Sequence, residues 1–536
     1  MAARYKLGSQ LSRISQRIGG LGINCQFTRL RAISGTNACF YSSKELEYKP
    51  LPPRILDIRN QAKAGLIKEG DDITIHGWIR SIRKQRKIAF AHVVDGSSDQ
   101  MFQLTFLNAD DASGLANGMS VKATGKLELV SHIDPYALRV SSVTILGGYS
   151  ADTTGTVATF PLQKKAMALD YIRRELPALR FRTSQIGSAM RLRSKSIASI
   201  SRFFDRDGYT QTQPPLITAS DCEGAGEVFT VVAEGVAHGE PSKFFGSKTY
   251  LTVSTQLHLE ALMMGLTRVW TLTPAFRAEE SATSRHLSEF WMLEAEVAFA
   301  DDLENIMSIV ERMIRACVSE LKQAGDFDSL VDLKRQLDKQ QRSDSDRLED
   351  EEVITAEGLV ERWDMLIGES RPWMRITYSD AIVVLEQAVS AGQATFQHPV
   401  EPDEGLKTEH EKWLAKHYAR GPVFVTHYPT HMKPFYMLQT VGSDTVECFD
   451  LLVPDLGELV GGSLRQHDYD GLQRAIVSAG LDDPAALDWY LELRRWGTVP
   501  HGGFGMGFER FICYIGGIQN IREAIAFPRW IDHCKC

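Results

Sequence analysis

Charged residues of both signs are concentrated between Phe276 and Phe299, in the stretch FRAEESATSRHLSEFWMLEAEVAF. The apolar residues at its two ends alternate as in β-strands, which predicts a hairpin whose connection holds the charges. An arginine at a strand end can bind a phosphate through two hydrogen bonds, and an aromatic ring on the adjoining strand can stack under a purine. Arg277 and Phe290 are placed for these two roles. The alternative for each charge, Arg285 included, is a cross-strand salt bridge that serves only the hairpin.

Two further clusters could complete a nucleotide site. In CFDLLVPDLGELVGGSLR, Asp450, Asp455 and Glu458 precede a glycine pair and Arg465. Carboxylates beside a phosphate site are the usual ligands of Mg²⁺, and glycines let the backbone approach a ligand closely. In HGGFGMGFERF the glycines lack the spacing of a dinucleotide-binding turn, and they precede an amphipathic helix that carries Arg510 in its first turn.

Five short strand patterns separated by turn residues run from Asp71 to about Gly148. Such a series predicts a small closed antiparallel barrel. The stretch RSIRKQRK gives this barrel a basic rim. A five-stranded barrel with a basic rim and an exposed aromatic is typical of OB-folds that bind single-stranded nucleic acid. The alternative is a structural barrel with a solvated charged loop.

A larger domain follows a charged hinge that we expect at residues 149–185. Apolar residues from Ile197 to Phe204 recur at helical spacing, which predicts an amphipathic helix that ends at Gly208 and leads into a strand before Pro214. We expect the charged, aromatic-poor segment near 323–352 to be an insertion on the surface of this domain. The domain itself is expected at residues 186–536.

Length and composition describe an ordinary globular protein. The chain has 536 residues, of which 43% are hydrophobic and 24% charged, and its net charge is -8. This length favours two domains with cores of their own. No apolar run approaches the ~20 residues that span a membrane, so we expect no membrane contact. Because the chain is mildly acidic, any contact with nucleic acid must be local.

The first 44 residues contain no acidic residue, whereas arginine and lysine recur among serine and leucine. This composition is typical of a mitochondrial transit peptide and lacks the continuous apolar region of a secretory signal. We therefore expect import into the mitochondrial matrix, with residues 45–70 as a linker. The alternative is a disordered basic tail on a cytosolic protein. The eight cysteines are scattered, which fits a reducing compartment.

Three ordered motifs and the barrel together resemble the class II aminoacyl-tRNA synthetases of the subgroup for aspartate, asparagine and lysine. The helix and strand before Pro214 are similar to motif one, FRAE with RH and FWMLE to motif two, and GFGMGFER to motif three. The resemblance covers about residues 70–536. It implies an α+β protein with an N-terminal OB-fold β-barrel at residues 71–148 that binds the anticodon. A catalytic domain with a mainly antiparallel sheet flanked by helices would follow, and the protein would be a homodimer.

The resemblance also implies roles for individual residues in binding ATP, Mg²⁺ and the amino acid. Arg277 would contact both the α-phosphate and the attacking carboxylate, and Arg510 would reach the γ-phosphate, so both would be catalytic. Phe290 would stack on adenine. The other expected ATP-binding residues are Glu279, Arg285, His286, Glu458 and Gly507. The expected amino-acid-binding residues are Glu223, Gln256, His258, Arg277 and Arg465, and the expected Mg²⁺ ligands are Asp450 and Glu458.

Within the subgroup, SDCEGAGEVF, QLHLE and GELVGGSLR are most similar to the asparaginyl enzymes. Aspartyl enzymes usually carry a lysine at the position matched to His258. A lysine would attract an aspartate carboxylate, whereas a neutral histidine suits an amide. The resemblance thus implies the ligation of L-asparagine to tRNA(Asn). Glu280 and Thr255 depart from the asparaginyl pattern, and an aspartyl enzyme, or one that charges both amino acids, stays the alternative.

Two barrel residues match anticodon-binding positions of this family. By the resemblance, Phe90 would stack on an anticodon base, and Gln103 would read the central uridine of the asparagine anticodon GUU. The alternative is that Phe90 packs inside the barrel, as aromatic residues of strands commonly do.

Overall fold

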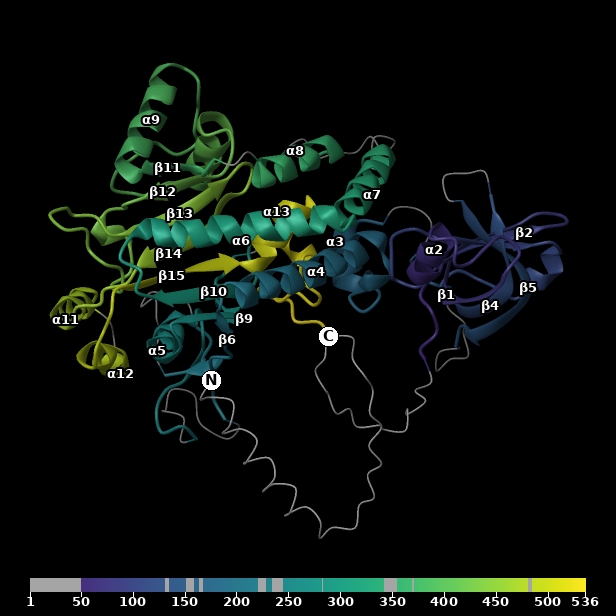
Figure 1. The fold of residues 1–536 in the computed structure, drawn as a ribbon, viewed down its shortest axis with the longest axis horizontal. Helices are drawn as coiled ribbons and strands as arrows, with labels where there is room; N and C mark the ends of the chain where they lie inside the picture. The colour runs from purple at the N-terminus through teal and green to yellow at the C-terminus, as the bar shows by residue number, and fades with distance from the viewer. Residues whose placement is uncertain are drawn as a thin grey trace, which may run out of the picture.

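The computed structural model describes residues 50–130, 135–150, 159–162, 167–219, 228–233, 244–281, 283–341, 354–368, 371–480 and 484–536. These residues form two bodies, a small barrel and a larger body built on an open sheet (Figure 1). The expected transit peptide, residues 1–44, lies outside the described residues.

The smaller body is a closed barrel of five strands in the order β1-β2-β3-β5-β4, which confirms the predicted barrel. Inward and outward residues alternate along its strands: Ala91 and Val93 of β2 and Leu104 of β3 are buried, whereas their neighbours are half-buried. Strands β3 and β5 pair in parallel and close the barrel. The elements are α2 (Ile55–Lys63), β1 (Asp72–Lys84), β2 (Ala89–Val94), β3 (Phe102–Phe106), β4 (Ser120–Leu129) and β5 (Tyr136–Gly147).

The larger body is built on an eight-stranded sheet in the order β11-β12-β13-β14-β15-β10-β9-β6. Only the two outermost pairs, β11 with β12 and β9 with β6, are parallel, so the predicted mainly antiparallel sheet is confirmed. Its strands are β6 (Thr210–Gln211), β9 (Arg268–Phe276), β10 (Glu289–Ala298), β11 (Met374–Thr377), β12 (Val423–Thr426), β13 (Cys448–Val453), β14 (Gly457–Leu464) and β15 (His501–Gly507). A separate pair is formed by β7 (Ile217–Thr218) and β8 (Tyr250–Leu251).

The long helices pack with the sheet around one hydrophobic core (Figure 1). Helix α4 is the predicted amphipathic helix: the hydroxyl of Thr183 accepts the N–H of Ile186 at its start, and Ile200, Phe203 and Phe204 are buried. The strand expected before Pro214 is only the two-residue β6. The helices of this body are α3 (Leu169–Glu175), α4 (Ser184–Arg206), α5 (Gln256–Leu266), α6 (Leu303–Gln323), α7 (Asp326–Gln341), α8 (Ala356–Ile367), α9 (Tyr378–Ser390), α10 (Thr408–Trp413), α11 (Tyr469–Ser478), α12 (Asp488–Glu492) and α13 (Phe508–Gly516).

The charged segment near 323–352 is helical over its described part, as α7. Phe327, Leu330 and Val331 of this helix are buried, and the Phe327 ring lies 4.5 Å from that of Trp363 on α8. Apolar residues at helical spacing among the charges therefore join this part of the segment to the core. Residues 342–353 lie outside the described part of the chain.

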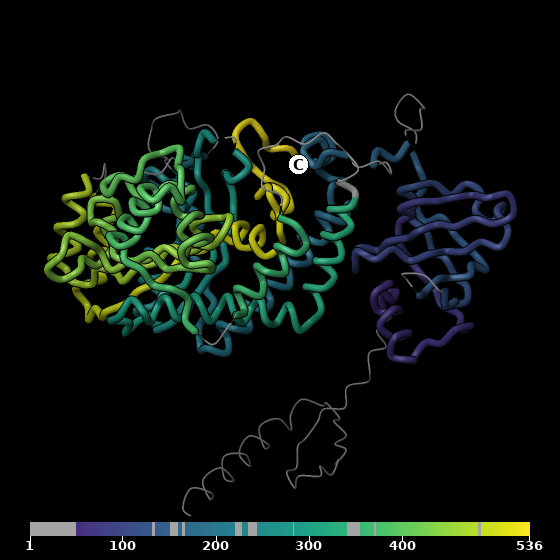
Figure 2. Tube along the Cα trace, turned by 90° about the horizontal axis from the view of Figure 1, so that it is seen from above, coloured from purple at the N-terminus to yellow at the C-terminus, as the bar shows by residue number. Residues whose placement is uncertain are grey.

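The barrel lies beside the larger body and contacts it near the hinge (Figure 2). Arg191 of α4 donates to the carbonyl of Gly96 at 2.9 Å and pairs with Asp99, both in the loop between β2 and β3. Arg182 of the hinge donates to the carbonyl of Gly118 in the barrel at 2.9 Å. One arginine of the hinge and one of α4 thus contact two loops of the barrel.

Among the described residues, no helix is long and apolar enough to cross a membrane.

Candidate active site

The three charged clusters of the sequence meet at one pocket of about 450 Å³ in the larger body. Strands β9, β10, β14 and β15 form one continuous part of the sheet, and the loops at their ends bring residues far apart in sequence together. Antiparallel pairing of β10 with both β9 and β15 places Arg277, Phe290 and Gly507 near one another. The pocket therefore collects residues of all three clusters, whereas Asp455 of the second cluster does not line it and pairs instead with Arg362 and Lys416.

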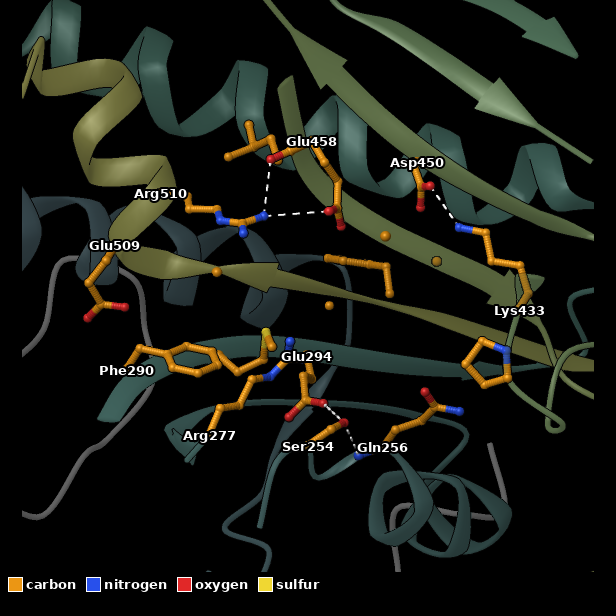
Figure 3. Close-up of a pocket in the computed structure, with 18 of the residues that line it drawn as sticks. Ser254, Gln256, Arg277, Phe290, Glu294, Lys433, Asp450, Glu458, Glu509 and Arg510 are labelled. Carbon is orange, nitrogen blue, oxygen red and sulfur yellow. Dashed lines mark hydrogen bonds and ion pairs between the residues drawn. The ribbon is translucent and has the colours of Figure 1, made fainter. Parts of the chain in front are cut away.

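One end of the pocket is suited to a nucleotide. The Arg277 guanidinium lies 5.7 Å from the centre of the Phe290 ring, and Arg510 extends from the first turn of α13 on the opposite side (Figure 3). Gly507 lies beside the Arg510 side chain, since a Cβ atom on this glycine would be in van der Waals contact with it at 3.6 Å. An aromatic ring between two guanidinium groups can bind a purine and its phosphates.

The connection between β9 and β10 adds three of the expected residues. Glu279 lies 3.7 Å from the Arg277 guanidinium and 3.5 Å from the His286 ring. His286 is held in turn by the Thr283 hydroxyl at 2.6 Å. Arg285 is exposed and lines the pocket. The structure therefore brings all the expected ATP-binding residues of this hairpin to the pocket.

Two carboxylates lie across the pocket from the Arg277 side chain (Figure 3). Asp450 accepts from the Lys433 ammonium at 2.7 Å, and Glu458 lies 3.5 Å from the Arg510 guanidinium. A Cβ atom on Gly461 would lie 3.4 Å from one oxygen of each carboxylate, so the two flank this glycine. Because Mg²⁺ takes only one or two protein oxygens and keeps most of its waters, this pair fits the ion. The described residues contain no group of three side chains that would suit another metal.

The other end of the pocket has a buried charged floor. Arg465 pairs with Glu296 through its Nε atom at 3.1 Å and through Nη2, and its Nη1 atom donates to Ser463 at 2.6 Å. Oxygen Oε2 of Glu296 is buried and has no hydrogen-bond partner among the described residues. Burial raises the pKa of Glu296, although Arg465 opposes the shift. A buried oxygen without a hydrogen bond raises the free energy of the folded protein. The place beside Arg465 therefore suits a ligand that donates a hydrogen bond to this oxygen.

Sequence reasoning missed three residues that line this pocket. Glu294 accepts from the backbone N–H of Thr255 at 3.0 Å and from the Ser254 hydroxyl, which anchors the start of α5 to β10. The alternation of β10 placed Glu294 and Glu296 on the face of Phe290, and that pattern could have assigned both to the site. The third is Lys433, which no motif of the sequence indicated.

One expected amino-acid-binding residue, His258, is not brought to the pocket. Gln256 and Arg465 line it, but His258 does not, since its ring packs 5.3 Å from that of Trp489 and burial lowers its pKa. Helix geometry explains the difference, because Gln256 and Glu260 share one face of α5 and His258 points to another. Glu223 lies outside the described residues.

The two barrel residues lie outside the core of the barrel. Phe90 is half-buried between the buried residues Ala89 and Ala91, so the core placement is excluded. Gln103 is half-buried on β3, where it lies opposite His92 and two residues from the partner of Phe90. Both side chains therefore lie on the outer face of the same pair of strands.

Comparison with known proteins agrees with this geometry. The family described as tRNA synthetases class II (D, K and N) matches residues 170–531, and the OB-fold nucleic acid binding domain family matches residues 73–146. The mitochondrial asparagine–tRNA ligase of Saccharomyces cerevisiae is 40% identical over 86% of this chain and 92% of its own length. The chain belongs to the asparaginyl-tRNA synthetases of class II. The mitochondrial enzyme of Schizosaccharomyces pombe is likewise 40% identical, over 94% of its own length.

Solved asparaginyl-tRNA synthetases share the fold. The enzyme of Pyrococcus horikoshii, complexed with asparaginyl-adenylate, is similar with a TM-score of 0.71 and 27% identity, over 87% of this chain and 96% of that one. The enzyme of Entamoeba histolytica is similar with a TM-score of 0.70 and 25% identity, over 91% and 100% of the two chains. As a member of this family, the chain is an aminoacyl-tRNA synthetase that uses ATP as a substrate.

Proposed function

We propose that this asparaginyl-tRNA synthetase activates L-asparagine with ATP and transfers it to tRNA(Asn) in the mitochondrial matrix. The observation that carries the choice of amino acid is the buried pair of Arg465 and Glu296 at the floor of the pocket. Arg465 has five N–H donors, of which three are used within the protein, and Glu296 has one acceptor oxygen left. A guanidinium beside a free carboxylate oxygen is complementary to a carboxamide.

This complementarity favours asparagine over aspartate. The side-chain carbonyl of asparagine can accept from Arg465, while its amide N–H groups donate to Oε2 of Glu296. An aspartate carboxylate in the same place would offer no donor, and it would meet the Glu296 carboxylate as a like charge. Glu294 lines the pocket as a second carboxylate on the same face of β10, two residues nearer to Phe290.

The first step needs no nucleophilic side chain. An oxygen of the asparagine carboxylate attacks the α-phosphorus of ATP, a new P–O bond forms, and the bond to the pyrophosphate oxygen breaks. Asparaginyl-adenylate and pyrophosphate result. Arg277, with Phe290 under the adenine, would hold the two anions together, and Arg510 would bind the far end of the triphosphate; both act by positioning and by offsetting charge. Mg²⁺, when held by Asp450 and Glu458, would neutralise charge on the phosphates.

The second step transfers the amino acid to tRNA. A hydroxyl of the terminal ribose attacks the carbonyl carbon of the adenylate, and AMP leaves with the bonding electrons. The barrel would hold the anticodon, with a base on Phe90 and the central uridine at Gln103. Half-buried aromatic and amide side chains on the outer face of a barrel with a basic loop support this assignment. Residues 71–148 would thus be the anticodon-binding domain, 149–185 the hinge and 186–536 the catalytic domain.

Location and assembly are further parts of the proposal. The acid-free N-terminus and the mitochondrial relatives support import, so a reporter fused to residues 1–44 should reach the matrix. Motif one is expected to form an isologous interface, so the protein should have the mass of a homodimer at micromolar concentration. A reporter that stays in the cytosol would contradict the import, and a monomeric mass would contradict the homodimer.

Exchange of pyrophosphate into ATP tests the amino-acid assignment directly. The purified protein, run separately with asparagine, aspartate and lysine, should exchange far faster with asparagine. Equal or faster exchange with aspartate would instead support an aspartyl enzyme or one that charges both amino acids.

A further inference from the structure

Beneath the amino-acid end of the pocket lies a second buried carboxylate, that of Glu260. It is fully buried on α5, one helical turn after Gln256. The Gln256 side-chain amide, which lines the pocket, donates to Oε1 of Glu260 at 3.1 Å. The Nε atom of Arg465 lies 3.9 Å from the same oxygen. Glu260 therefore contacts two residues expected to bind the amino acid without lining the pocket itself.

The other partners of Glu260 come from the segment that precedes and begins β15. The Tyr490 hydroxyl, on α12, lies 2.9 Å from Oε1 and 2.8 Å from Oε2. The Arg494 guanidinium is 2.6 Å from Oε2, and the His501 ring is 3.1 Å from it. All three side chains are buried. A buried carboxylate is stable only with such donors, so this segment determines where the carboxylate lies.

The same segment also reaches the residue after Arg465. The Nε atom of Arg494 donates to the carbonyl of Gln466 at 3.0 Å, while Arg465 itself donates its backbone N–H to His501 at 2.9 Å. The side chain of Arg494 thus connects Glu260 on α5 with the end of β14. These contacts join both walls of the amino-acid end of the pocket through one buried network.

We propose that Tyr490 and Arg494 are positioning residues that orient Gln256 and Arg465 for the amino-acid side chain through the Glu260 carboxylate. The inference rests on the proposed function, since it assigns these residues to the amino-acid end of that site. Neither residue lines the pocket, so neither touches substrate. Loss of either contact leaves Glu260 free to shift toward Gln256 or Arg465, and asparagine binding weakens while ATP binding does not.

Tyr490→Phe tests the proposal, because it removes one hydroxyl and keeps the ring in place. In pyrophosphate exchange the variant should show a KM for asparagine raised about tenfold, the scale of one hydrogen bond to a charged group. The KM for ATP should stay within about twofold of the unmodified value, as the ATP end shares no contact with this network. The preference for asparagine over aspartate should fall as well.

Tyr514→Phe is the matched control. Tyr514 of α13 is buried, and its hydroxyl has no hydrogen-bond partner in the part of the chain that the structure describes, so the same chemical change should leave both KM values unchanged. If Tyr490→Phe does not fold, Arg494→Lys supplies the same readout, since it keeps the charge and loses the fork that reaches both Glu260 and Gln466.

Two outcomes would overturn the inference. One is an unchanged KM for asparagine, even if kcat is lowered. The other is an equal increase in the KM values of asparagine and ATP. Exchange by the unmodified protein, measured alongside, separates this result from the proposed function. If the unmodified protein fails to exchange with asparagine, the proposed function is wrong, whatever the variants do.

Discussion

A single unpaired oxygen, Oε2 of Glu296, carries more information about the substrate than any motif of the chain. The arginines proposed to bind phosphates and the aromatic proposed to stack on adenine would serve the activation of any amino acid, so they do not distinguish one amino acid from another. The Arg465–Glu296 pair does, because it combines a donor and an acceptor in a buried place where both must be satisfied. We therefore assign the choice of amino acid to the Arg465–Glu296 pair at the floor of the pocket.

Glu296→Gln tests this choice. The substitution keeps the shape of the side chain and removes the negative charge that would repel aspartate, so we expect the ratio of kcat/KM for asparagine to that for aspartate to fall by about tenfold or more, equivalent to ~1.4 kcal/mol. Exchange assays with both amino acids measure it. Glu289→Gln, at the outer end of the same strand, is the control and should leave the ratio unchanged. An unchanged ratio in Glu296→Gln would contradict the assignment.

The two arginines of the ATP end give a second prediction. Arg277→Ala and Arg510→Ala should each raise the activation barrier of adenylate formation by roughly 2–4 kcal/mol, the scale known for one preorganised donor. Single-turnover formation of adenylate measures the loss, and thermal unfolding shows whether the fold survives. Arg268→Ala is the control. Arg268 is at the start of β9, the strand that ends just before Arg277, and its guanidinium donates to the Asp207 carbonyl away from the pocket. A near-normal rate of adenylate formation in either variant would show that the replaced arginine has only a structural role.

At the scale of elements, helix α5 shows what the sequence could not tell. QLHLE sits in a helix that is apolar on nearly every side, so no polar face reveals which residues point to the pocket. His258 was assigned to the amino-acid site from resemblance alone, whereas its ring packs against Trp489. Glu260 needs partners more than 200 positions later, on α12 and β15, and sequence spacing carries no information on such contacts.

The barrel and the sheet show the opposite case. Alternation of apolar and polar residues predicted five barrel strands, because each strand has one face in the core and one in water. The hairpin of β9 and β10 was predicted for the same reason. The strand before Pro214 was predicted as well, but it is shorter than expected, since β6 has only two residues. The buried face of α7 was missed because charge density outweighed the spacing of Phe327, Leu330 and Val331.

Phe90→Ala tests the outer face of the barrel. Loss of a stacked base costs roughly 1–3 kcal/mol of binding, so tRNA charging should weaken by that amount while pyrophosphate exchange without tRNA stays normal. Because Phe90 is half-buried outside the core, the melting temperature should change little. Phe102→Ala supplies the contrast: Phe102 is fully buried in the barrel, and its truncation should lower the melting temperature. Full charging activity in Phe90→Ala would refute the role proposed for this residue.

At the scale of the whole molecule, two sites must act on one tRNA, and the barrel has to be held at a fixed place beside the catalytic body. The hinge is held by Arg182, whose guanidinium lies 5.3 Å from the Trp78 ring of the barrel and 4.8 Å from that of Phe160. Gly118 has a φ of +86°, and a Cβ atom there would lie 2.4 Å from the Phe160 ring. The glycine therefore lets the hinge approach the barrel closely.

Arg191 makes the other connection between the barrel and the larger body. The side chains of Arg191 and Asp99 are only 29% and 15% exposed, so their contact is partly desolvated and stronger than an ordinary surface pair. In Arg191→Ala the barrel is held less firmly, and the second binding site on tRNA loses effective concentration. We expect the KM for tRNA in charging to rise by about tenfold, equivalent to ~1.4 kcal/mol, with pyrophosphate exchange unchanged.

Lys195→Ala is the control on the same helix, since Lys195 pairs with Asp326 within the catalytic body at 2.8 Å. Asp99→Ala should reproduce the effect, and the double variant should add little to either single one, because the two side chains act as one contact. An equal loss in exchange and charging, or full additivity of the two substitutions, would show that Arg191 acts on the catalytic body rather than on the position of the barrel.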